Sequence, residues 1–362
     1  MMFTLKKSLF PTVALLLAFA PTAFGAGMDP QLMEKSRRAI DGGLHYLRGQ
    51  QQPDGSLLGS VGVTALSLRA FLESHRGYNE GDGAFITKQV EFILSKVNSD
   101  GSISETMQNR SYNTAVALNA LAATGNPEYA EVIANGQKFL TGHQIDEGEG
   151  YDKSHRYYGG LGYGGDERPD MSNLYLALEA LKGTAEDPKD PVWDKALVFV
   201  SRSQNRSESN DQEWAGNDGG FIYMPGWNPP EYGGTNSYGG MTAAGLISLL
   251  FAGVDKADPR IQAAYKWLAD NYTLEVNPGT EAKHGLFYFY NAFGKVMAAY
   301  GEDEFTDSRG QKHAWRSDLA RKLVSLQRPD GSWVNVDSNK WWEDKPELVT
   351  AWTVIALEHA IR

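Results

Sequence analysis

A motif repeated six times along the chain constrains the fold more than any other feature. In each copy a bulky apolar residue is followed four positions later by a residue that is usually Gln. The pairs are Leu47/Gln51, Ile93/Val97, Leu140/Gln144, Val200/Gln204, Leu268/Tyr272 and Leu323/Gln327. Three copies continue, at identical spacing, into Asp-Gly-Ser at residues 54–56, 100–102 and 330–332. Repeats of this length indicate stacked supersecondary units.

Two kinds of helical segment alternate around this motif. Each copy ends an amphipathic segment, as at 192–204, 260–272 and 315–327, and a Gly-rich loop follows it. A more uniformly apolar segment comes next; these segments are 61–72, 112–123, 171–181, 241–252, 287–300 and 348–359. Helices that are apolar on most sides are buried, and amphipathic helices cover them. We therefore predict an all-α fold, a single (α/α)6 toroid of six outer and six inner helices, with an open superhelix of helical pairs as the alternative.

The N-terminus has the features of a secretory signal peptide. Lys6 and Lys7 precede an apolar run at 13–20, and a small-residue cleavage site would leave Ala26 first. An uncleaved anchor is the alternative, although the run is short for a membrane span. We predict three segments and a secreted or periplasmic location: a signal peptide at 1–25, an N-terminal linker at 26–33 and the toroid at 34–362.

Charge and cysteine content limit the partners. Cleavage would remove two lysines and leave 32 basic against 45 acidic residues, a net charge of −13. This balance argues against nucleic acid and anionic membrane surfaces as partners, and we expect no stable membrane insertion after cleavage. The chain has no cysteine, so burial of the core must stabilise it without disulfides.

The sixth copy carries a recognisable family motif. Arg321 and Lys322 precede Leu323, and Gln327-x-x-x-Gly331-x-Trp333 follows, which resembles the Q-W repeat of terpenoid cyclases. As a set, the helix pairs over about residues 34–362 resemble the α/α toroid shared by squalene cyclases and protein prenyltransferase β subunits. The resemblance implies that Gln ties a helix end to the following loop, while Gly and Trp pack the turn. The motif therefore indicates a scaffold more than a chemistry.

The chemical signatures of that superfamily are missing from the sequence. Squalene-hopene cyclases carry an Asp-x-Asp-Asp proton donor, and this chain has no such run. Prenyltransferase β subunits hold zinc through Asp, Cys and His, and complement-type toroids form a thioester through Cys, which this chain lacks. We expect no metal and no cofactor. The sequence does not decide whether the protein is an enzyme. If it is one, we expect a terpenoid cyclase-type isomerase or lyase first and a polysaccharide lyase second.

Two long loops, 145–170 and 205–238, interrupt the regular spacing. In a ring of repeats they emerge on the same rim, beside the inner-helix N-termini, and long ordered loops commonly carry function. Their aromatic and polar side chains suit an isoprenoid, through cation–π contacts, or a sugar, through stacking. Simple packing of the loops is the alternative. The ligand-binding candidates are Arg156, Tyr163, Trp214, Trp227, Tyr232 and Tyr238.

Three residues are catalytic candidates. Asp170, just before the third inner helix, is a candidate acid, with an ordinary helix N-cap as the alternative. His155 and Tyr157 are candidate bases, with Arg156 placed to neutralise a uronate carboxylate in a polysaccharide lyase. His284, before the fifth inner helix, is a further ligand-binding candidate, with a capping or surface histidine as the alternative.

Three functions remain open at this point. The first is a secreted toroid that binds or acts on an isoprenoid in its central cavity. The second is a periplasmic polysaccharide lyase or other glycan-processing enzyme, and the third is a non-catalytic toroid that binds a peptide or glycan. The expected partner is a small hydrophobic or glycan ligand.

Overall fold

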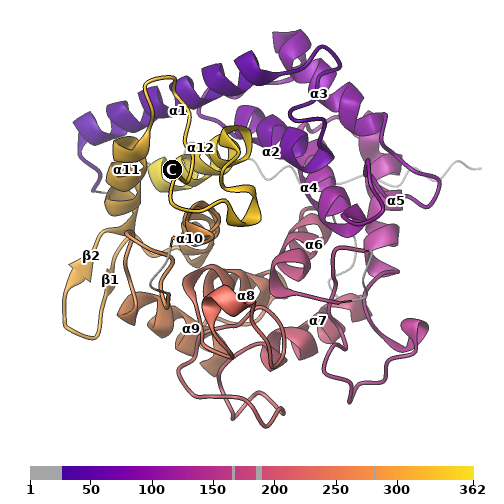
Figure 1. Cartoon of the computed structure of the whole chain (residues 1–362), viewed down its shortest axis with the longest axis vertical. Coiled ribbons are helices and arrows are strands. Elements are labelled where there is room, and N and C mark those ends of the chain that lie inside the picture. The colour runs from indigo at the N-terminus through magenta and orange to yellow at the C-terminus, as the bar shows by residue number, and fades with distance from the viewer. Residues whose placement is uncertain (1–26, 165–167, 185–189, 281–282) are drawn as a thin grey trace, which may run out of the picture.

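The structure, a computed structural model, describes residues 27–164, 168–184, 190–280 and 283–362 as a ring of helices (Figure 1). The outer helices are α1 (Pro30–Gln50), α3 (Ala84–Leu94), α5 (Ala130–Thr141), α7 (Pro191–Arg202), α9 (Pro259–Asp270) and α11 (Trp315–Leu326). The inner helices are α2 (Val61–Leu72), α4 (Arg110–Ala123), α6 (Met171–Thr184), α8 (Gly239–Phe251), α10 (Leu286–Tyr300) and α12 (Pro346–Ile361). A hairpin of β1 (Phe305–Thr306) and β2 (Lys312–His313) joins α10 to α11. Single 3₁₀ turns lie at Glu80–Asp82, Pro127–Tyr129, Glu147–Glu149, Pro230–Tyr232 and Lys340–Trp342.

The ring is closed. Each inner helix packs on the inner helices before and after it, and α12 returns to pack on α2. In the outer layer α1 packs on α11, its neighbour across the junction between the two ends of the chain (Figure 1). The (α/α)6 toroid is therefore confirmed, and the open superhelix is excluded.

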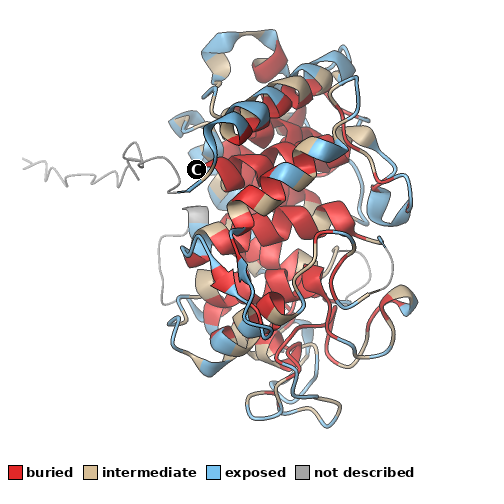
Figure 2. Ribbon diagram, turned by 90° about the vertical axis from the view of Figure 1, so that its left-hand side faces the viewer, coloured by how far each residue is buried: buried red, intermediate tan, exposed pale blue. Residues whose placement is uncertain are grey.

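Burial separates the two layers as the periodicity predicted. Every residue of α2 from Val61 to Phe71 is buried, whereas α1 buries a stripe that includes Ile40, Leu44 and Leu47. Figure 2 shows this contrast, with buried residues concentrated in the inner helices. The stripe forms because residues three and four apart share one face of a helix. None of the helices in the described ranges combines the length and apolar character needed to cross a membrane.

The predicted linker needs a correction. Helix α1 begins at Pro30, so residues 30–33 are helical and not part of a linker. The Asp29 carboxylate accepts hydrogen bonds from the amides of Gln31 and Leu32, and proline is favoured in the first turn because its missing N–H needs no partner. The predicted signal peptide at 1–25, together with Ala26, lies outside the described residues.

The repeated glutamines join neighbouring repeats. Gln204 Nε2 donates to the Gly219 carbonyl in its own loop at 2.9 Å and to the Arg260 carbonyl of the next outer helix at 2.8 Å. Equivalent pairs of bonds are made by Gln51, to Gly55 and Phe85; by Gln144, to Gly159 and Val192; and by Gln327, to Gly331 and Ala39. The bond from Gln327 to Ala39 links the sixth repeat to the first. The expected tie between helix and loop is thus present, and it also fastens each repeat to the next.

Gly331 and Trp333 complete this junction. Gly331 has a φ of 88°, and a Cβ atom there would lie 2.5 Å from the carbonyl oxygen of Gly42 in α1, so only glycine fits. Trp333 is fully buried, and its indole N–H donates to the Leu323 carbonyl at 2.7 Å. The backbone of the turn can therefore approach α1 closely.

Candidate functional site

A cavity of about 270 Å³ lies on the axis of the ring, with residues of all six inner helices in its wall. It opens on the rim where the outer helices run into the inner ones. Along α2, Ser60, Val63, Leu66 and Arg69 face the cavity at three-residue intervals. The wall therefore extends from the N-cap of α2 down to Arg69, about 14 Å at the rise of an α-helix.

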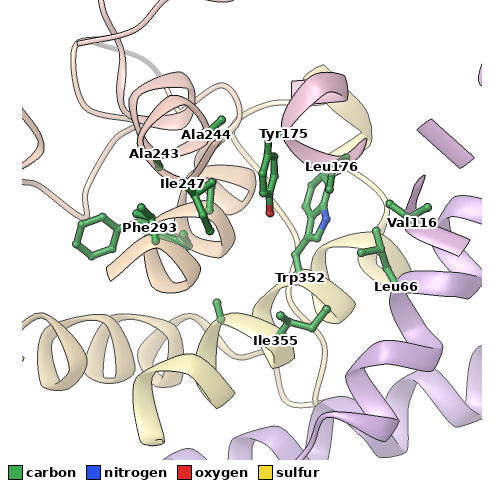
Figure 3. Close-up of a cluster of buried hydrophobic side chains, with 14 of the residues drawn as sticks. Leu66, Val116, Tyr175, Leu176, Ala243, Ala244, Ile247, Phe293, Trp352 and Ile355 are labelled. Atoms are coloured by element: carbon green, nitrogen blue, oxygen red, sulfur yellow. The ribbon is translucent and has the colours of Figure 1, made fainter. Parts of the chain in front are cut away.

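Aromatic side chains dominate the wall. Those that line it are Tyr112, Tyr163, Tyr175, Tyr223, Tyr232, Tyr238, Tyr288, Trp341, Trp342 and Trp352. Several pack on one another; the rings of Tyr232 and Tyr238 stack with their centroids 4.0 Å apart. Below them, Leu66, Val116, Leu176 and Ile355 form an apolar sleeve, which Figure 3 shows together with Tyr175 and Trp352.

The tyrosines act as neutral hydroxyl groups. Burial raises the pKa of Tyr112, Tyr163 and Tyr288, so these hydroxyls stay protonated at neutral pH. The Tyr288 hydroxyl is buried and has no hydrogen-bond partner within the described part of the chain. A buried hydroxyl without a partner is costly unless a ligand or water satisfies it, so this oxygen is available to a bound molecule.

Charged side chains close the deep end of the cavity. Glu179 lies between two cations, accepting from Lys295 Nζ at 2.8 Å and from Arg69 Nη2 at 3.1 Å. Lys295 Nζ also donates to the Tyr175 hydroxyl at 2.6 Å, and Arg69 Nε donates to Glu73 at 2.7 Å. Arg69, Lys295 and Tyr175 face the cavity, and Glu179 is not part of the lining.

The carboxylate in this cluster stays ionised. Burial opposes ionisation of Glu179, but the charges of Arg69 and Lys295 outweigh that effect and lower its pKa to about 2. Burial also lowers the pKa of Lys295, against the attraction of Glu179. The floor of the cavity is therefore a set of paired charges below a wall that is mostly aromatic and apolar.

Asp170 lies behind the wall and does not line the cavity. Its side chain is 1% exposed, and Oδ1 accepts the amides of Ser172 and Asn173, each at 2.9 Å, as an N-cap does. Oδ2 accepts from Asn173 Nδ2 at 2.6 Å. Burial raises the pKa of Asp170, while these hydrogen bonds oppose the rise. The N-cap geometry is present; the acid role remains a prediction.

The other predicted residues fall into two groups. Tyr163, Tyr232 and Tyr238 line the cavity. His155, Arg156 and Tyr157 lie together on the third loop, with Arg156 Nη2 donating to the Tyr157 hydroxyl at 2.9 Å, but they do not face the cavity.

The remaining three candidates also lie outside the lining. Trp227 packs against Tyr223, with the ring centroids 6.0 Å apart. Trp214 lies beside Gly226 in the fourth loop. His284 Nδ1 is hydrogen-bonded to the Ser338 hydroxyl at 2.7 Å, one residue before Gly285 at the cavity mouth.

The lining residues on the inner helices and in the sixth loop were not among the predicted site residues. Arg69 and Lys295 are charged residues inside uniformly apolar segments, a signal that was visible in the sequence. Trp341 and Trp342 follow the sixth copy of the repeat, and both lie at the mouth with positive φ angles of 58° and 62°. No group of His, Asp or Glu residues in the described ranges is placed to hold a metal ion.

The closed ring with its axial cavity defines an (α/α)6 toroid. No protein-family model and no curated protein sequence matches the chain. Among solved structures, the chain is similar to a protein from Actinoplanes, with 16% identity over 90% of this chain and 100% of that one, at a TM-score of 0.54. It is also similar to an Asp-to-Asn variant of the type II terpene cyclase MstE from Scytonema, solved with its substrate geranylgeranyl dihydroxybenzoate. That similarity has 13% identity over 91% of this chain and 98% of the cyclase, at a TM-score of 0.54, and shows a shared fold alone.

Proposed function

We propose that the protein binds an isoprenoid-type ligand in its axial cavity. The observation that carries the proposal is the lining itself, in which tyrosine and tryptophan rings surround an apolar sleeve on the ring axis. Aromatic faces attract unsaturated hydrocarbon and cationic groups, and a concave apolar site with few polar groups is typical of ligand pockets. The cyclase from Scytonema holds an isoprenoid on the same fold, which is consistent with such a ligand here.

Binding is favoured over cyclisation because of how the carboxylates are placed. Starting a cyclisation requires a neutral acid in contact with the ligand. Of the described carboxylates only Glu105 lines the cavity, and its Oε2 accepts from the Val61 amide at 3.1 Å and from Asn113 at 3.0 Å near the mouth. Asp170 is outside the lining, and its carboxylate is hydrogen-bonded to Tyr223, which lines the cavity. We therefore propose a binding protein.

Calorimetric titration of the mature chain, residues 26–362, with farnesol tests this proposal. We expect one saturable site, weakened about fivefold or more by Trp342→Ala, because this side chain is 52% exposed and lines the mouth, so its removal spares the fold. The matched control is Val336→Ala, an 84% exposed residue of the same loop outside the lining, which should bind as the unmodified protein does.

Two results would refute the proposal. One is the absence of farnesol binding by folded protein. The other is release of ultraviolet-absorbing unsaturated uronides from a polyuronate, abolished by His155→Ala, which would assign the function to the third loop as a polysaccharide lyase.

We also propose that the protein is exported through its N-terminal segment. Support comes from the two lysines, the apolar run and the small-residue site before Ala26. Mass spectrometry of the protein secreted or released from the periplasm should give Ala26 as the first residue. An intact Met1 on the exported protein would contradict cleavage.

A further inference from the structure

We infer that the closed end of the cavity, at Arg69, Lys295 and Tyr175, binds a carboxylate, so that the ligand is an amphiphile whose carboxylate head enters first. This inference rests on the proposed function, because it assigns the chemical class of a ligand bound in the same cavity. It concerns residues other than Trp341 and Trp342, which line the mouth.

Two hydrogen-bond donors at the floor are free to meet a ligand. The bonds of Arg69 use Nε and Nη2, and Nη1 has no bond to any residue that the structure describes. The Tyr175 hydroxyl accepts from Lys295 and keeps its own proton for a further bond. Both residues are buried, with Arg69 at 7% and Tyr175 at 1% exposure, and both face the cavity. Buried donors of this kind favour an acceptor that a ligand supplies.

The charge at the floor favours one negative charge on the ligand. Arg69 and Lys295 are each 8% exposed, and Glu179, at 12%, is the carboxylate buried between them. Glu73 also pairs with Arg69, but it is 24% exposed, so solvent screens it more. The three most buried groups, Arg69, Lys295 and Glu179, carry one net positive charge, and Glu73 brings the four to formal neutrality. A singly charged carboxylate therefore suits the floor better than a phosphate dianion.

The geometry of the donors suits a carboxylate as well. Arg69 Nη1 is a donor on a charged group, and charge-assisted bonds to a carboxylate are roughly twice as strong as neutral ones. The ammonium of Lys295 polarises the Tyr175 hydroxyl, which makes that hydroxyl a better donor. These bonds would offset the cost of removing the carboxylate from water.

The distribution of charge along the axis of the cavity determines the orientation of the ligand. Glu105 lies at the mouth and repels an anion, whereas the cations lie at the floor. Between them the ring of Leu66, Val116, Leu176 and Ile355 accepts an apolar body. The ligand would therefore lie with its head at Arg69 and its hydrocarbon toward Trp341 and Trp342.

Titration with three probes that share one hydrocarbon tests the assignment: farnesoic acid, farnesol and farnesyl phosphate. We expect farnesoic acid to bind about tenfold more tightly than farnesol at neutral pH, and farnesyl phosphate to bind more weakly than the acid. Arg69→Gln should remove the preference for the acid. Tyr175→Phe keeps the ring and removes one donor, so it should reduce the preference several-fold if Arg69→Gln fails to fold.

The matched control is Tyr265→Phe on outer helix α9, whose hydroxyl bonds Glu302 away from the cavity and whose loss should leave both affinities unchanged. Equal binding of acid and alcohol, with no effect of either floor variant on their ratio, would overturn the inference and leave the proposed function standing. Tighter binding of the phosphate than of the acid would overturn the choice of a carboxylate. Failure of all three probes to bind would instead overturn the proposed function.

Discussion

The repeated glutamine should stabilise the ring most where it is most deeply buried. Gln204 is fully buried, and its Nε2 donates to the carbonyls of Gly219 and Arg260. The variant Gln204→Met keeps a side chain of similar length and removes both bonds. The Arg260 carbonyl lies in the first turn of α9, where it can still accept a hydrogen bond within the helix, so loss of the bond from Gln204 costs about 1 kcal/mol. The Gly219 carbonyl loses its partner in a dry site, which costs about 1–3 kcal/mol.

One effect reduces this cost. The Oε1 atom of Gln204 is itself buried and has no partner among the residues that the structure describes, so its removal relieves a small penalty. We therefore expect Gln204→Met to lower the free energy of unfolding by about 2 kcal/mol. Urea unfolding followed by far-ultraviolet circular dichroism measures this loss, provided that the dependence on urea is the same in both proteins.

The equivalent residue of the first repeat supplies the control. Gln51 makes the same two bonds at 3.0 and 3.3 Å but is only half-buried, so water can replace the lost donor. Gln51→Met should cost about 0.5–1 kcal/mol. Equal losses in the two variants, or a loss below about 0.5 kcal/mol for Gln204→Met, would refute the reasoning that buried bonds between repeats hold the ring.

Three other predictions concern the junction, a buried acid and the mouth. Gly331→Ala should destabilise the fold by more than about 2 kcal/mol in urea unfolding, because its Cβ would meet backbone, whereas Gly310→Ala, at similar φ in open space, should cost only about 1 kcal/mol. Burial raises the pKa of Glu343 to about 7 from an ordinary 4.5. The contribution of this group to the free energy of unfolding is therefore complete below pH 4.5 and is lost as the pH rises through 7. Glu343→Gln should therefore flatten the fall in unfolding free energy between pH 5 and 8, and an unchanged slope would contradict this cause. Trp341→Gly removes a left-handed non-glycine residue, so unfolding free energy should change by less than about 1 kcal/mol while calorimetry shows farnesol binding weakened several-fold.

The sequence predicted the helices well because burial dictates their composition. The segment predicted at 61–72 is α2 to the residue, and the segment predicted at 112–123 begins two residues late, since α4 starts at Arg110. A helix that is buried on every side must be apolar throughout, and few other structures have this pattern. The toroid was predicted to begin at residue 34, whereas α1 begins at Pro30 after the Asp29 cap.

The site was harder to predict than the fold. The long loops drew attention to Tyr163, Tyr232 and Tyr238, which line the cavity, and their role in ligand binding stays a prediction. The floor was missed although its charges stand out in apolar helices, where a charge persists only when it is paired or faces a cavity. Pairing could not be derived, because Arg69 and Glu179 are 110 residues apart and meet only after the ring closes.

The repeat explains why the scaffold motif says little about the ligand. In four repeats a threonine of the inner helix accepts the backbone N–H of the residue after the Gly-rich turn; these residues are Thr64, Thr114, Thr242 and Thr350. Five positions further along, the same repeats carry Arg69, Asn119, Ile247 and Ile355. The bonds that hold the ring use the outer-helix ends, the turns and the first turn of each inner helix. They leave the deeper positions free to differ. Two of these positions line the cavity, so a ring of nearly equivalent repeats can place a cation, Arg69, and an aliphatic side chain, Ile355, at matching points of its wall.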